Sequence, residues 1–115
     1  MMKFEERRKY PRMRREEQAV IRRVDDPDED PVHTTLYCKT IDVSPTGMQV
    51  RLKKALQSGE HVDVIIQVEG YGNSFHLFGE IKWCRELPGE DGCLAGIQVL
   101  DADHSDLASW KRVFN

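Results

Sequence analysis

Apolar and polar residues alternate in several short stretches of the chain. Within 47–52, for example, Met48, Val50 and Leu52 share one side of an extended backbone, and polar residues lie between them. A period of two is typical of a half-buried β-strand. The pattern predicts strands at Gln18–Val24, Thr34–Val43, Gly47–Leu52, His61–Glu69, residues 75 to about 86, and Cys93–Leu100. Six or seven short strands separated by turn residues indicate an all-β protein, either an antiparallel barrel or a sandwich.

The C-terminal segment follows a different period. Leu107, Trp110 and Phe114 recur at spacings of three and four, which predicts a short helix over about 103–114. We expect its apolar stripe to pack against the barrel, and a contact in a dimer is the alternative.

The N-terminal residues show neither period. Pro11 disfavours helix at Tyr10 and has no amide donor of its own. Residues 1–15 are therefore predicted to be a flexible basic arm. Residues 16–115 then form the barrel with its helix, and one domain is expected for a chain of 115 residues. The acidic stretch Asp25–Val32, which contains two prolines, is predicted to be a loop between strands.

Charge is distributed unevenly along the chain, whose net charge is −3. Residues 1–23 contain nine Lys and Arg against four Glu, which gives this part +5 and leaves −8 for the remainder. The acidic remainder argues against binding of long nucleic acid, whereas the basic arm is suited to a small anion.

The sequence contains no clear signal for a metal site, a set of disulfides or a membrane span. Cys38, Cys84 and Cys93 are far apart, and the four histidines have no metal-ligand spacing. No stretch approaches the roughly 20 apolar residues of a membrane span, and the charged N-terminus lacks the apolar region of a signal peptide. We therefore expect a cytoplasmic protein without a metal or a cofactor.

The arm contains a run of basic residues, Arg7-Arg8-Lys9-Tyr10-Pro11-Arg12. A guanidinium group is a planar fork that binds phosphate, or the O6/N7 edge of guanine, through two hydrogen bonds at once. Arg8 and Arg12 are four residues apart on a stretch that is not helical, so both are able to contact one ligand. A solvated basic tail is the alternative.

A turn between two predicted strands carries a second set of candidates, Asp42-Val43-Ser44-Pro45-Thr46-Gly47. Serine, proline and glycine occupy the positions that they favour in a type I turn. Asp42 is able to accept from the N–H edge of a base or to hold an arginine, and Ser44 is able to bind a phosphate or a base. Gly47 lets a ligand approach the backbone. An ordinary hairpin turn is the alternative.

The order of the two motifs, Arg8-x-x-x-Arg12 and then Asp42-x-Ser44-x-x-Gly47, resembles that of the PilZ domain family, over most of the chain. The resemblance implies a basic arm, a six-stranded antiparallel β-barrel and a C-terminal helix. It also implies that the ligand is cyclic dimeric GMP (c-di-GMP), bound by Arg7, Arg8, Arg12, Asp42, Ser44 and Gly47.

Two residues of a late strand, Trp83 and Arg85, are secondary candidates, because a residue near this position contacts the ligand in some PilZ relatives. The alternation places Trp83 on one face with Phe75, Leu77 and Ile81. Packing in the core is therefore the favoured interpretation of this tryptophan.

We expect a receptor rather than an enzyme, because no catalytic set occurs at a recognisable spacing. Binding of c-di-GMP would order the arm and reshape a surface that an unidentified downstream protein recognises. The alternatives are a PilZ-like protein-interaction module without nucleotide binding and a barrel that binds single-stranded nucleic acid. A monomer or a weak homodimer is expected.

Overall fold

The computed structural model describes residues 13–24 and 35–114, with only the backbone described at residues 13 and 14. The three arginines of the arm motif, Arg7, Arg8 and Arg12, and the predicted acidic loop lie outside the described residues.

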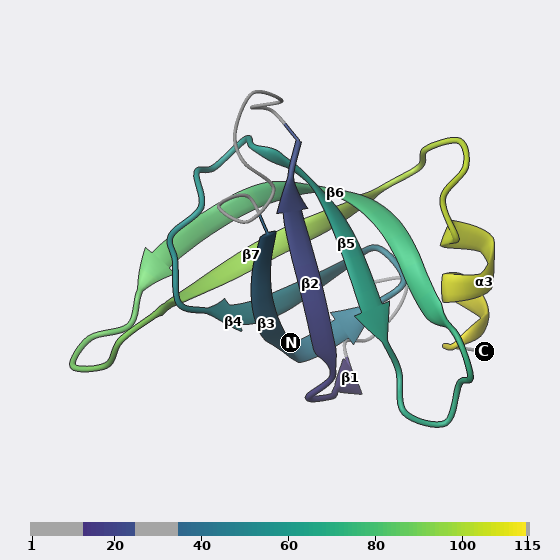
Figure 1. The fold of residues 1–115 in the computed structure, drawn as a ribbon, viewed down its shortest axis with the longest axis horizontal. Coiled ribbons are helices and arrows are strands. Elements are labelled where there is room, and N and C mark those ends of the chain that lie inside the picture. The colour runs from purple at the N-terminus through teal and green to yellow at the C-terminus, as the bar shows by residue number, and fades with distance from the viewer. Residues whose placement is uncertain (1–12, 25–34, 115) are drawn as a thin grey trace, which may run out of the picture.

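Strands make up most of the described part of the chain (Figure 1). The elements are β1 (Met13–Arg14), β2 (Gln18–Arg23), β3 (Thr35–Ser44), β4 (Gly47–Leu52), β5 (His61–Gln67), β6 (Ser74–Glu86), β7 (Cys93–Leu100) and the helix α3 (Leu107–Arg112). Each of the six predicted strands is present with small changes at its ends, so the prediction of an all-β protein is confirmed.

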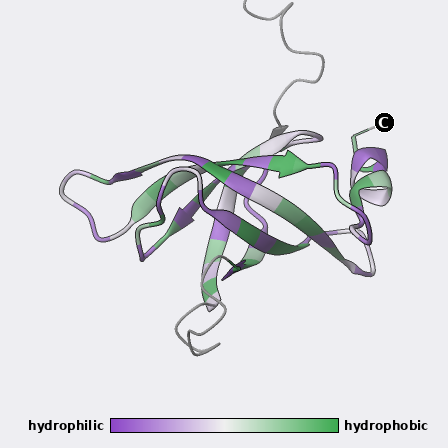
Figure 2. Ribbon diagram, turned by 90° about the horizontal axis from the view of Figure 1, so that it is seen from above, coloured by the Kyte–Doolittle hydropathy of each residue, from purple (hydrophilic) through white to green (hydrophobic). Residues whose placement is uncertain are grey.

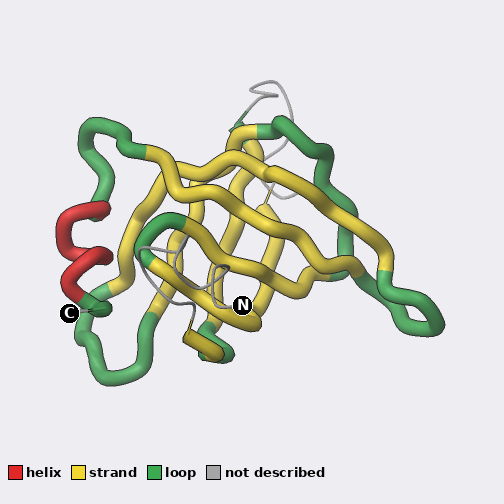
Figure 3. The backbone as a smooth tube through the Cα atoms, turned by 180° about the vertical axis from the view of Figure 1, so that it is seen from behind, coloured by secondary structure: helices red, strands yellow, loops and turns green. Residues whose placement is uncertain are grey.

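The six longer strands close into an antiparallel barrel. Their order is β3–β2–β5–β6–β7–β4, and β4 pairs with β3 to complete the ring. Figure 3 shows the ring from behind, with α3 beside one end. Closure gives each long strand two neighbours and decides between the barrel and the sandwich. The short strand β1 also pairs with β3, beyond the part of β3 that pairs with β2.

The barrel core consists of the inward residues of each strand. Along β5, Val62, Val64 and Ile66 are buried, whereas His61 and Gln67 are exposed. Figure 2 shows hydrophobic and hydrophilic residues alternating along the strands. Complete burial of a Val or Ile side chain contributes roughly 1.5–3 kcal/mol, so these inward faces favour closure of the sheet.

A β-bulge in β6 overturns one prediction. The register between β6 and β7 shifts between Ile81 and Trp83, which makes Lys82 the extra residue. Phe75, Leu77 and Ile81 are buried as predicted, but Trp83 is 36% exposed. An extra residue reverses the face to which the following side chains point. The predicted core position of Trp83 is therefore wrong.

The helix α3 packs against the barrel, as its apolar stripe predicts. Trp110 is fully buried, and its ring meets those of Phe75 and Phe114 edge-on, at centroid distances of 5.6 and 5.1 Å. The helix is shorter than predicted because it begins after Asp106, whose carboxylate accepts a hydrogen bond from the His76 amide (2.8 Å). Across residues 13–24 and 35–114, no helix has the length and apolar character needed to cross a membrane.

Candidate functional site

The strand β1 brings the end of the predicted arm to the Asp-x-Ser-x-x-Gly segment. Met13 pairs with Val43, and Arg14 pairs with Asp42, in an antiparallel ladder. Arg12, the last arginine of the arm motif, directly precedes this strand in the sequence. The part of the arm nearest the barrel is thus a strand of the sheet, held beside one of the candidate ligand-binding residues.

Ser44 shapes the turn between β3 and β4. Its hydroxyl oxygen accepts hydrogen bonds from the amides of Thr46 (3.3 Å) and Gly47 (3.1 Å), and the hydroxyl donates to the Gly47 carbonyl (3.2 Å). Neither Pro45 nor Thr46 has a positive φ, which excludes turns of types II, I′ and II′ and agrees with the predicted type I turn. Ser44 is buried, so a direct contact between its hydroxyl and a ligand stays a prediction.

The carboxylate of Asp42 is held by a neighbour on β4. Nε2 of Gln49 donates a hydrogen bond to Oδ2 of Asp42 at 3.0 Å. The register between β3 and β4 shifts between Thr40 and Asp42, so a second bulge lies directly before this aspartate. Bulges redirect side chains at the ends of strands. Gln49 was not predicted as a site residue, although the alternation placed it on the polar side of its strand.

Trp83 lies against Gly96, its partner in the ladder between β6 and β7. A Cβ atom at position 96 would overlap the indole ring of Trp83, so any residue other than glycine would force the ring to move. The guanidinium carbon of Arg85 lies 5.6 Å from the centroid of the Trp83 ring, which is a cation–π distance. The two secondary candidates therefore contact each other on the outer side of β6.

A hollow in the barrel surface joins the turn to Trp83. It is lined by Thr46, Gly47, Lys82, Trp83, Gly96, Ile97 and Gln98. An indole ring, an ammonium group and the backbone of two glycines suit a planar base attached to a phosphate. The structure therefore brings together the turn and the late strand, two features that are distant in the sequence.

The described residues provide little for metal or thiol chemistry. Among them, no three His, Cys, Asp or Glu side chains are placed to hold a metal ion. Burial raises the pKa of Cys38 to about 12, and it also raises the pKa of Cys93, whose thiol contacts that of Cys84. A thiol that stays protonated is a poor nucleophile and a poor metal ligand.

Comparison with known proteins places this geometry in a family. The family model described as the PilZ domain matches residues 6–113. The PilZ domain of YcgR from Escherichia coli, solved with c-di-GMP, has a TM-score of 0.68 at 19% identity, over 94% of this chain and 88% of that one. The inhibitor of motility MotI/DgrA from Bacillus subtilis has a TM-score of 0.68 at 17% identity, over 94% of this chain and 49% of that one.

MrkH, described as a c-di-GMP-dependent transcription regulatory factor, has a TM-score of 0.66 at 13% identity, over 93% of this chain and 49% of MrkH. The chain thus spans about half the length of MotI/DgrA and of MrkH. No curated protein matches it. These structural similarities show a shared fold, and the family model covers nearly the whole sequence. The chain belongs to the PilZ domain family.

Proposed function

We propose that this protein binds c-di-GMP at the hollow beside the Asp-x-Ser-x-x-Gly turn and acts as a receptor gated by this ligand. The observation that carries the proposal is the pairing of Arg14 with Asp42, because it ties the arginine arm to the second motif. Membership of the PilZ family supports it, as does the similarity to a YcgR domain that was solved with c-di-GMP.

The arm supplies the positive charge that a doubly charged ligand requires. In the proposal, Arg8 and Arg12, with Arg7 beside them, bind the two phosphates and the O6/N7 edges of the guanines. The chain outside residues 1–23 carries a net charge of −8. Such a body repels a long polyanion, while the arm attracts a small one, so the charge distribution favours a dinucleotide over a nucleic-acid strand.

The turn supplies groups that recognise a base. Asp42, held by Gln49 at 3.0 Å, accepts hydrogen bonds from the N1–H and N2–H₂ groups of a guanine or orients an arginine of the arm. Ser44 acts through the turn that its hydroxyl closes. Gly47 lines the hollow without a side chain and lets the ligand approach the backbone.

The late strand supplies an aromatic surface. Trp83 lines the hollow and is partly exposed, so a guanine can stack on its ring. Stacking of a base on an aromatic side chain contributes about 1–3 kcal/mol. Arg85 lies against the same indole and adds positive charge beside the ligand.

Gating follows from the attachment of the arm. In the proposal, the part of the arm that precedes β1 is flexible without ligand because its like charges repel, and the phosphates of the ligand neutralise that repulsion. The arm then becomes ordered across the barrel, and a downstream protein recognises the altered surface. The proposed role is therefore that of a receptor or adaptor, in which the chain performs no chemical step on its ligand.

Chemical-shift mapping by NMR tests the proposed site. On titration with c-di-GMP, we expect shifts at the amides of Arg14, Asp42 and Gly47 and at the indole N–H of Trp83. Shifts confined to the helix α3 would contradict this location.

Substitutions test the individual residues. Arg8→Ala and Asp42→Ala are each expected to weaken binding at least tenfold, or by about 1.4 kcal/mol. Arg51→Ala is the matched control, because this exposed arginine forms its ion pair with Glu90, away from the hollow. Equal affinity of Arg8→Ala and the wild type would refute the assignment of the arm.

A further inference from the structure

A buried threonine fastens the chain between β1 and β2 to β3. Thr40 is 1% exposed and lies two residues before Asp42. Its hydroxyl accepts a hydrogen bond from the Glu17 amide (2.8 Å) and donates one to the Arg15 carbonyl (2.5 Å). Two main-chain bonds run alongside, from the Thr40 amide to the Glu17 carbonyl (2.9 Å) and from the Arg15 amide to the Ile41 carbonyl (3.1 Å). One hydroxyl thus joins two residues of the connection to the strand that carries Asp42.

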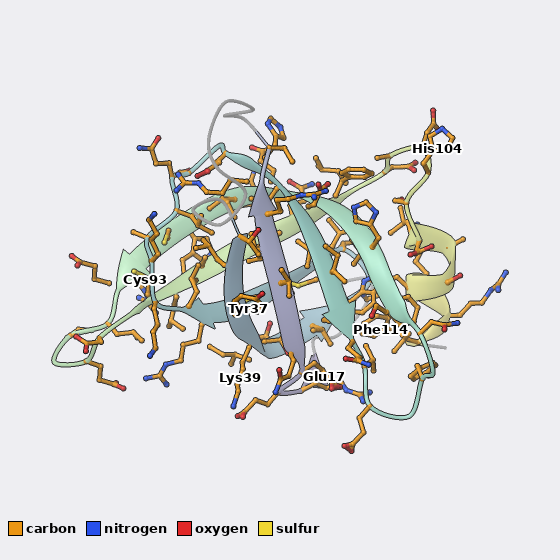
Figure 4. All side chains as sticks on the ribbon, in the orientation of Figure 1. Glu17, Tyr37, Lys39, Cys93, His104 and Phe114 are labelled. Carbon is orange, nitrogen blue, oxygen red and sulfur yellow. The ribbon has the colours of Figure 1, made fainter. Side chains whose placement is uncertain are left out.

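The side chain of Glu17 fastens the same connection to a second place. Glu17 directly precedes the first residue of β2 (Figure 4) and is 8% exposed. Its carboxylate accepts hydrogen bonds from the Glu69 amide (3.2 Å) and from Nε of Arg15 (3.0 Å). A buried carboxylate is tolerable only when it is paired and hydrogen-bonded, and both conditions hold here. Residues 15–17 are therefore attached both to β3 and to the segment after β5.

This attachment matters because β1 is short. A strand of two residues forms too few ladder bonds to fix its own register. A slip of one residue along β3 would break the pairing of Arg14 with Asp42 and shift the point at which the arm meets β3. The bonds at Thr40 oppose such a slip, because its hydroxyl satisfies groups on two residues that have to stay in place together.

We propose that Thr40 is a positioning residue for ligand binding: its hydroxyl sets the register in which the arginine arm meets Asp42. This inference rests on the proposed function. Thr40 itself is buried and does not touch the ligand. It acts through Arg15 and Glu17, and so through the direction in which the chain leaves the barrel.

The test compares Thr40→Val, which keeps the shape and removes the hydroxyl, with Thr40→Ser, which keeps the hydroxyl. Thr35→Val, at the other end of β3, is the matched control. Affinity for c-di-GMP is measured by calorimetry well below the melting temperature of each variant, where a purely structural role would leave it unchanged. We expect about tenfold weaker binding for Thr40→Val, and binding within about twofold of the wild type for Thr40→Ser and Thr35→Val.

Amide hydrogen exchange gives a second readout that does not need the ligand. In Thr40→Val, exchange should become faster at Arg15 and Glu17 while the amides of β5 and β6 keep their protection. If Thr40→Val fails to fold, Glu17→Gln replaces it, since it removes the carboxylate charge that pairs with Arg15 and should weaken binding about threefold. If the wild type binds c-di-GMP and the variant binds it with the same affinity, the role of Thr40 is overturned while the proposed function stands. A wild type that does not bind c-di-GMP would overturn the proposed function as well.

Discussion

Nε1 of Trp110 donates a hydrogen bond to the main-chain carbonyl oxygen of Ser44, 3.2 Å away, in a buried environment. The indole is fully buried and packs edge-on against Phe75 of β6. The C-terminal helix is therefore attached directly to the turn at which we propose that the ligand binds.

Replacement of Trp110 by phenylalanine tests the structural value of this contact. Trp110→Phe should lower the free energy of unfolding by about 1–3 kcal/mol, because the Ser44 carbonyl loses its buried donor and a small void remains. Urea denaturation measures the change. Trp83→Phe is the control and should stay within about 0.5 kcal/mol of the wild type, because that ring is partly exposed. Equal losses in the two variants would contradict the different roles of the two tryptophans.

Replacement of Trp83 by alanine tests the proposed stacking surface. Trp83→Ala should weaken c-di-GMP binding by about 1–3 kcal/mol, because the base loses its aromatic partner. Calorimetry measures the affinity. Tyr37→Ala is the matched control, since Tyr37 is the most exposed large hydrophobic side chain of the described residues, at 78%, and does not line the hollow. If both variants bind like the wild type, Trp83 does not stack on the ligand.

Addition of one methyl group at position 96 tests the arrangement of the hollow. In Gly96→Ala the new Cβ overlaps the Trp83 indole, so the ring has to move. We expect a destabilisation of about 1–3 kcal/mol, a change in tryptophan fluorescence and weaker c-di-GMP binding. Gly72→Ala is the control, because a Cβ there meets no atom within 4 Å. Unchanged fluorescence in Gly96→Ala would show that Trp83 does not lie against this glycine.

The buried thiol of Cys38 predicts a pH dependence of stability. Burial raises its pKa from 9.0 to about 12 in the folded protein. The stability that its protonated form provides is therefore complete below about pH 9 and is lost as the pH rises towards 12. Between these values the free energy of unfolding should fall by about 1.4 kcal/mol per pH unit more in the wild type than in Cys38→Ala. Denaturation series at about pH 8 and about pH 10 measure this difference, and parallel series in the two proteins would exclude the effect.

Alternation located the strands because the barrel buries one face of each strand. Val62, Val64 and Ile66 form a row that only an inward strand face explains. The bulge at Lys82 left no comparable signal, since a lysine at that position fits an unbroken strand equally well. The inward prediction for Trp83 failed for this reason, and the register of β6 against β7 was needed to correct it.

The candidate site was predictable from the sequence where its residues lie close together along the chain. Asp42, near the end of β3, and Gly47, at the start of β4, flank one hairpin turn, so their spacing alone indicated a possible role. Residues that act through distant partners were missed, because sequence spacing does not reveal which buried groups meet. Thr40 bonds to Glu17 across 23 positions, and Trp110 bonds to Ser44 across 66.

The central claim is that this protein binds c-di-GMP through its arginine arm and its turn. Calorimetric titration of the full chain with c-di-GMP, beside an identical titration of Arg8→Ala, tests it most directly. We predict saturable heat of binding for the wild type and at least tenfold weaker binding for the variant. Absence of binding heat from the wild type at high ligand concentration would contradict the claim.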